Sequence, residues 1–139
     1  MFPSEGYFYV KSQKNGLFVS VDGEDEAGSK LVTGPKGDDD SQLWSYENGY
    51  LVSKQTAMVM DIEGGDLKSD KRVLQFNRKK TMTHNQRWGI RDGFVYVVAD
   101  PRLVLDTQED EGSYITVAVK KSEENDLQQW YLEPYEGDC

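Results

Sequence analysis

Three Gln-x-Trp triplets combine an amide, which both donates and accepts hydrogen bonds, with a large indole ring. They occur at 42–44, 86–88 and 128–130 and contain all three tryptophans of the chain. The tryptophans are 44 and 42 positions apart, which indicates an internal repeat. An indole that recurs once per repeat most simply packs in a shared core, with its N–H bonded. We therefore expect the Gln and Trp to serve mainly the fold.

Other groups that could do chemistry are sparse. The only histidine, His84, has no nucleophile motif beside it, so we expect no catalysis and no cofactor. Acidic runs at 22–26 and 37–40 could bind Ca²⁺, but neither has the EF-hand pattern, and solvated loops are the simpler interpretation. The single cysteine, Cys139, excludes an internal disulfide and is expected to be a terminal thiol.

Composition narrows the classes of partner. A chain of 139 residues is expected to form one domain with a buried core, and it has no apolar run long enough for membrane insertion. Its net charge of −9 disfavours nucleic acid, and the one basic cluster, at 77–80, is short enough to be a solvated loop. The N-terminus lacks the pattern of a secretory signal, so the expected location is cytoplasmic or non-classically secreted.

Short apolar blocks rich in Val, Ile, Tyr and Phe recur about every ten residues. Turn pairs such as Asn15-Gly16 and Gly64-Gly65 separate them, and no helical period exceeds two turns. Gly49-Tyr50 and Gly93-Phe94 each follow a Gln-x-Trp by five residues, and Gly6-Tyr7 holds the matching place 43 residues before Gly49. The chain is therefore predicted to be all-β, with repeats at about 1–48, 49–92 and 93–139 in a single domain, 1–139.

Three repeats of about four strands each leave two main architectures. Three propeller blades could not surround a central channel, since propellers need about four to eight. A closed barrel with threefold pseudo-symmetry removes the free sheet edges with this number of strands. The sequence thus predicts a β-trefoil.

The three in-phase triplets, with "VMDIEGG" and "LVLD" segments upstream, resemble the ricin B-chain type of β-trefoil lectin over the whole chain. The opening "GYFYVKS" is similar to small fungal members. The resemblance implies binding of galactose- or N-acetylgalactosamine-containing glycans or glycoproteins, without catalysis. The cysteines that often staple each repeat of the plant toxins are missing, so their secreted context need not carry over.

The resemblance also implies a site chemistry. In the family, an Asp at a strand end accepts hydrogen bonds from two sugar hydroxyls, an aromatic ring covers the apolar sugar face, and an Asn orients on another hydroxyl. The middle repeat carries all three, as Asp61, Phe76 and Asn85. Gln86 is expected to steady the aspartate, and Gly64 permits a tight turn after it.

The first repeat has lost each group. Ser20 stands where Asp61 would be, and the ring position falls at Gly34 or Thr33. Ser41 replaces the asparagine. Asp22 keeps the strand parity of Ser20, so a displaced role is an alternative to a solvated turn.

The third repeat is intermediate, with a weak or absent second site expected at Asp106 and Gln128. The ring position falls on Ala118 or Val119, and Leu127 replaces the asparagine. Tyr114 could supply a ring from a different place.

A protein-interaction module is the main alternative, because the same fold also supports inhibitors and signalling ligands. Two degraded sites out of three would suit such a module, whereas the complete middle set favours a lectin. A homo-oligomer stays open, since one site per chain cannot crosslink cells.

Overall fold

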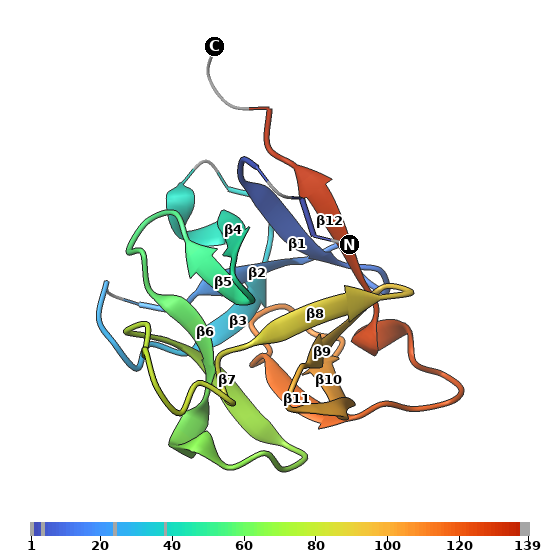
Figure 1. Cartoon of the computed structure of the whole chain (residues 1–139). Coiled ribbons are helices and arrows are strands. Elements are labelled where there is room, and N and C mark those ends of the chain that lie inside the picture. Colours follow the sequence, from blue (N-terminus) through green and yellow to red (C-terminus); the bar gives the residue numbers. More distant parts are fainter. Residues whose placement is uncertain (1, 4, 24, 38, 137–139) are drawn as a thin grey trace.

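The computed structural model describes residues 2–3, 5–23, 25–37 and 39–136, and these form an all-β structure (Figure 1). The strands are β1 (Phe8–Ser12), β2 (Phe18–Val21), β3 (Leu31–Gly34), β4 (Trp44–Glu47), β5 (Tyr50–Ser53), β6 (Val59–Ile62), β7 (Lys71–Phe76), β8 (Trp88–Arg91), β9 (Phe94–Val97), β10 (Asp100–Asp106), β11 (Thr116–Val119) and β12 (Trp130–Pro134). Three 3₁₀ helices of one turn each are η1 (Asp40–Gln42), η2 (Glu63–Gly65) and η3 (Asp126–Gln128). Within the described ranges, no helix is long and apolar enough to cross a membrane.

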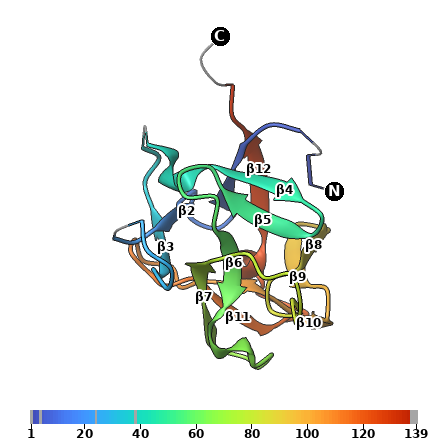
Figure 2. The ribbon, with the colours of Figure 1, turned by 60° about the vertical axis from the view of Figure 1, so that its left-hand side comes forward.

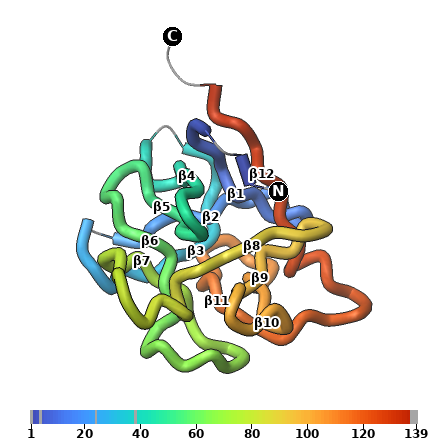
Figure 3. The backbone as a smooth tube through the Cα atoms, in the orientation of Figure 1, coloured from blue at the N-terminus to red at the C-terminus, as the bar shows by residue number. Residues whose placement is uncertain are grey.

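Six strands close into a ring. Between repeats, β1 pairs with β12, β4 with β5 and β8 with β9, all antiparallel. Within repeats, β1 pairs with β4, the Trp88 N–H donates to the Gly49 carbonyl at 2.8 Å, and the Trp130 N–H donates to the Gly93 carbonyl at 2.8 Å. The first and last strands of the chain therefore lie side by side (Figures 2 and 3). Closure leaves this ring without a free edge.

The remaining strands form the hairpins β2–β3, β6–β7 and β10–β11. Strand β7 pairs with β11, and single bridges join Lys30 to Leu74 and Val32 to Tyr114. Each hairpin thus contacts both others. A ring of six strands with three converging hairpins is the β-trefoil, and the predicted fold is confirmed.

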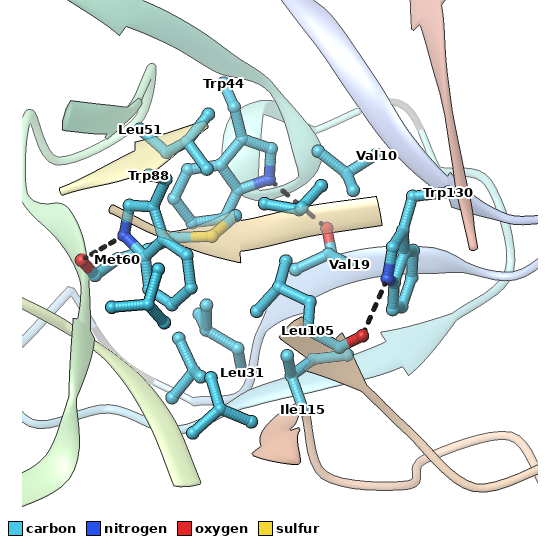
Figure 4. Packing of buried hydrophobic residues seen from close by; sticks show 14 of the residues in the cluster. Val10, Val19, Leu31, Trp44, Leu51, Met60, Trp88, Leu105, Ile115 and Trp130 are labelled. Atoms are coloured by element: carbon cyan, nitrogen blue, oxygen red, sulfur yellow. Dashed lines mark hydrogen bonds between the residues drawn. The ribbon is translucent and has the colours of Figure 1, made fainter. Parts of the chain in front are cut away.

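The three tryptophans all lie in the main core cluster (Figure 4). Their exposed fractions are 0%, 0% and 2%, and each indole N–H donates to a backbone carbonyl. The acceptors are Val19 at 3.5 Å, Met60 at 3.1 Å and Leu105 at 3.1 Å. In each repeat the residue after this carbonyl occupies the predicted carboxylate position. The shared core therefore fixes the strand that carries the site.

The sequence-based match of Gly6-Tyr7 to Gly49-Tyr50 was wrong by two residues. Cross-strand register places Tyr50 opposite Glu47 and Phe94 opposite Arg91, and the residue in this place in the first repeat is Tyr9, opposite Glu133. The match of Gly6-Tyr7 to Gly49-Tyr50 fails because β1 starts at Phe8, two residues beyond Gly6, whereas β5 and β9 start directly after their glycines.

Candidate functional site

The glutamine of each triplet makes the same three hydrogen bonds. Gln86 Nε2 donates to Asp61 Oδ2 at 2.8 Å and to the Asn77 carbonyl at 3.0 Å, and Gln86 Oε1 accepts from the Lys79 N–H at 2.9 Å. The matching partners are Ser20 Oγ, the Pro35 carbonyl and the Gly37 N–H for Gln42, and Asp106 Oδ2, the Val119 carbonyl and the Lys121 N–H for Gln128. The glutamine therefore serves every repeat, with or without an acid.

These bonds also settle which residues hold the ring position. The residue before each accepting carbonyl is Phe76, Gly34 or Ala118. Strand register agrees, because each of the three faces the residue two places before the carboxylate position. Only the middle repeat has an aromatic ring there.

The middle repeat brings the predicted residues together. Asp61 lies at 5% exposure in β6, and Asn85 Nδ2 donates to Asp61 Oδ1 at 3.2 Å. The Phe76 ring, at the end of β7, stays 40% exposed. Together with Gly64, these side chains line a surface cavity of about 240 Å³. Gly64 has a φ of 77° in the turn after β6, a left-handed conformation that glycine adopts without strain.

Lys79 is a site residue that the sequence interpretation missed. It was expected in a solvated loop, yet its side chain is half-buried and lines the cavity. Its Nζ donates to Asn85 Oδ1 at 2.8 Å. Its spacing, three residues after Phe76 and six before Asn85, was the available signal. The flanking Arg78 and Lys80 are exposed, as expected for that loop.

The hydrogen-bond inventory assigns roles that differ from the expected ones. Asn85 Nδ2 already donates to Asp61 Oδ1 and to the Ile62 carbonyl at 3.0 Å, which uses both of its N–H groups. Asp61 accepts one amide bond on each oxygen and, with about four acceptor positions in a carboxylate, retains room for two hydroxyls. Lys79 uses one N–H on Asn85 and keeps two. Lys79 therefore has the free N–H donors that were expected of Asn85.

Electrostatics at Asp61 balance burial against nearby donors. Burial raises the pKa of the Asp61 carboxyl, while the Gln86 hydrogen bond and the nearby Lys79 and His84 act in the lowering direction. His84 lies beside the cavity, where its Nε2 contacts the Gly65 carbonyl at 2.8 Å. Burial therefore disfavours the charged form of the carboxylate, and hydrogen bonds from a polar ligand would stabilise that form.

The first repeat lacks this constellation. Its ring position is Gly34. The uncharged Ser20 Oγ accepts the hydrogen bond from Gln42 Nε2 at 2.9 Å. Asp22 is exposed beyond the end of β2.

Of the three groups expected to contact the sugar, the third repeat keeps only the acid. Asp106 Oδ1 accepts from the Thr107 N–H at 2.7 Å, and Gln128 reaches Asp106 Oδ2 at 3.4 Å. Burial also raises the pKa of Asp106. Tyr114 instead faces the Arg72 guanidinium, 4.1 Å from its ring centre.

Side chains suited to holding a metal ion gather nowhere among the described residues. In that part of the chain, no three His, Cys, Asp or Glu side chains are placed to hold a metal ion together. Glu24 and Asp38 of the acidic runs, and Cys139, lie outside the described residues.

The ring of six strands and the three converging hairpins define a β-trefoil. The Ricin-type beta-trefoil lectin domain matches residues 6–130. The chain therefore belongs to this family, and the resemblance seen in its sequence is confirmed.

Individual relatives agree with the family. Mucoricin from Rhizopus delemar is 39% identical over 107 residues, 73% of this chain and 73% of its own. The mdaA-1 domain in solution has a TM-score of 0.88 at 28% identity, covering 98% of this chain and 93% of that one. The C-half of an earthworm R-type lectin, solved in complex with GalNAc, has a TM-score of 0.81 at 19% identity, covering 94% and 100%. The family match supports carbohydrate binding, and the solved structures support the β-trefoil fold.

Proposed function

We propose that the chain binds galactose- or N-acetylgalactosamine-containing glycans, without catalysis, at one site in its middle repeat. The main support is a cavity lined by both the Asp61 carboxylate and the exposed Phe76 ring. Neither group is needed for the fold, because the first repeat forms the same glutamine network around Ser20 and Gly34. A buried charge and an exposed ring that the fold does not require indicate a ligand.

The chemistry matches a galactose ring. Its 3-hydroxyl and axial 4-hydroxyl are adjacent and can both donate to Asp61, forming charge-assisted hydrogen bonds. Its C–H face then lies on the Phe76 ring, and the remaining N–H groups of Lys79 can donate to a hydroxyl oxygen. The equatorial 4-hydroxyl of glucose points elsewhere, which gives the site its preference.

The cavity sets a modest affinity. At about 240 Å³ it is smaller than the roughly 300–1,000 Å³ of pockets that enclose drug-sized ligands, so it suits one sugar ring held at the surface. We expect a Kd on the order of 0.1–1 mM, or about −4 to −5.5 kcal/mol.

Calorimetric titration with methyl galactoside, and with methyl glucoside as the matched sugar, tests the proposal. The wild type should bind galactoside with a stoichiometry near one. Asp61→Ala should abolish binding, while Asp106→Ala should retain most of it. Equal losses from the two substitutions would contradict the assignment to the middle repeat, and a glycan array with no bound sugar would overturn lectin function in favour of a protein-interaction module.

A further inference from the structure

Each repeat carries a ring–cation cluster, which is one aromatic residue outside the main core with a cation over its ring. Lys36 Nζ lies 4.8 Å from the Tyr9 ring centre, and the Arg78 guanidinium lies 4.7 Å from that of Tyr50. In the third repeat, Lys120 Nζ lies 4.3 Å from the Phe94 ring centre. The cations are equivalent, because each directly follows the carbonyl that accepts from the triplet glutamine. The three clusters therefore serve as internal controls for one another.

An acid neutralises the cation in two of the three clusters. Glu133 pairs with Lys36 at 2.7 Å, and Glu47 pairs with Arg78 at 3.1 Å. The equivalent position in the third repeat, opposite Phe94 in the strand register, is Arg91. Across the described ranges, neither Arg91 nor Lys120 has a salt-bridge partner within 4.0 Å. The third cluster thus carries two uncompensated positive charges in a protein of net charge −9.

The third cluster is also the one left open. The central triplet residue Leu43 packs with Tyr9 in the first repeat, and Arg87 lies over Tyr50 at 4.3 Å in the second. The third central residue, Gln129, instead bonds the Asn125 side chain at 2.8 Å. A cavity of about 210 Å³ is present here, lined by Arg91, Phe94, Tyr96, Pro101, Val104 and Lys120.

We propose that this cavity binds a small organic anion built on a ring. Its carboxylate would interact with Lys120 and Arg91, where charge-assisted bonds are the strong kind. Its ring would lie against the half-buried Tyr96 and the exposed Pro101, which line the same cavity. Asp100, beside the cavity residue Pro101, does not compete for the two cations because it is paired with Arg102 at 2.9 Å and 3.0 Å. This site is separate from the sugar site and does not depend on it.

Two probes distinguish the sources of such an anion. Sodium benzoate represents aromatic acids and sodium glucuronate represents acidic sugars, with benzyl alcohol and methyl glucoside as neutral counterparts. Titrations followed by ¹H–¹⁵N NMR should give saturating shifts at the amides of Phe94, Tyr96 and Lys120. Shifts with either anion alone support the site and identify its source. No saturable shift there with either anion, or equal shifts with the neutral counterparts, overturns it.

Arg91→Glu supplies the decisive variant. It recreates the acid–cation arrangement that the first two repeats already fold with, so a folded protein is expected. Anion binding should weaken by at least about tenfold, because the new carboxylate pairs with Lys120 and repels the ligand. Lys68→Glu is the matched control, since it makes the same charge change at an exposed lysine outside the cavity and should retain binding. Undiminished binding in Arg91→Glu contradicts the proposal, as does an equal loss in both variants.

Discussion

Replacing Asp61 with serine should separate sugar binding from folding. In the first repeat, Ser20 already holds this position and accepts from Gln42 Nε2 at 2.9 Å. A serine at position 61 can therefore give Gln86 the same kind of partner. The core beneath is untouched, because the Trp88 indole bonds the Met60 carbonyl and not the side chain that changes.

The structure sets the expected change in the free energy of unfolding and the expected loss of binding energy. The substitution loses the Asn85 hydrogen bond to Asp61 Oδ1, worth about 1 kcal/mol, while Asn85 keeps its bond to the Ile62 carbonyl. It also removes a carboxylate whose raised pKa shows that its charge is poorly solvated, which acts in the opposite direction. The free energy of unfolding should change by less than about 1 kcal/mol. Binding should lose two charge-assisted hydrogen bonds, about 3–6 kcal/mol, which is comparable to the whole expected binding energy of about 4–5.5 kcal/mol.

Urea denaturation measures the first effect, with fluorescence of the three buried tryptophans as the signal. Galactoside titration of the same preparation measures the second. Asp106→Ser is the matched control, because it makes the same replacement beside Gln128 and should keep both stability and binding. A variant at position 61 that is destabilised by more than about 2–3 kcal/mol, or that still binds galactoside, would refute the reasoning.

Further predictions concern the glutamine network, the Phe76 ring, the Asp61 carboxylate and self-association. Gln86→Ala and Gln42→Ala should each lower the free energy of unfolding by about 2–4 kcal/mol in urea titrations, because each removes the three hydrogen bonds of a buried glutamine. A cost below about 0.5 kcal/mol would contradict the structural role. Phe76→Ala should keep stability within about 0.5 kcal/mol, since the ring is 40% exposed, and should weaken galactoside binding about tenfold or more by calorimetry. Galactoside affinity should fall as pH drops through the raised pKa of Asp61, above the ordinary aspartate value of about 3.9, because protonation removes the acceptor charge. The same raised pKa means that ionised Asp61 destabilises the fold, so wild type should lose stability relative to Asp61→Ser as pH rises through that window. Finally, sedimentation beside haemagglutination should show that a strictly monomeric form does not agglutinate cells, because one site cannot crosslink them.

The sequence predicted the fold because the repeated groups are those that the fold requires. Each indole N–H must find an acceptor in the core, and it finds one at the residue before the carboxylate position in every repeat. The period of the tryptophans therefore determines both the number of repeats and the place of Asp61. The residues of the middle repeat were chosen from the family resemblance, which implies an aromatic residue about ten positions before the triplet Gln and an Asn directly before it. Phe76 and Asn85 hold these positions.

What the sequence could not give depends on pairing between distant strands. The equivalence of Tyr9 with Tyr50 required the register of β1 against β12, which joins the two ends of the chain. The role of Lys79 required knowing that its loop folds back over Asn85. The sequence shows that Arg91 replaces the acid of the other two repeats. The consequence depends on Lys120, which a different part of the chain brings to the same Phe94 ring.

Side-chain amide resonances test the central claim most directly, because each repeat carries one triplet glutamine in the same network. During galactoside titration followed by ¹H–¹⁵N NMR, the side-chain amides of Asn85 and Gln86 should shift and saturate together, since both bond Asp61. Those of Gln42 and Gln128 should stay in place. Saturating shifts at Gln42 or Gln128 with none at Gln86 would contradict a single site in the middle repeat.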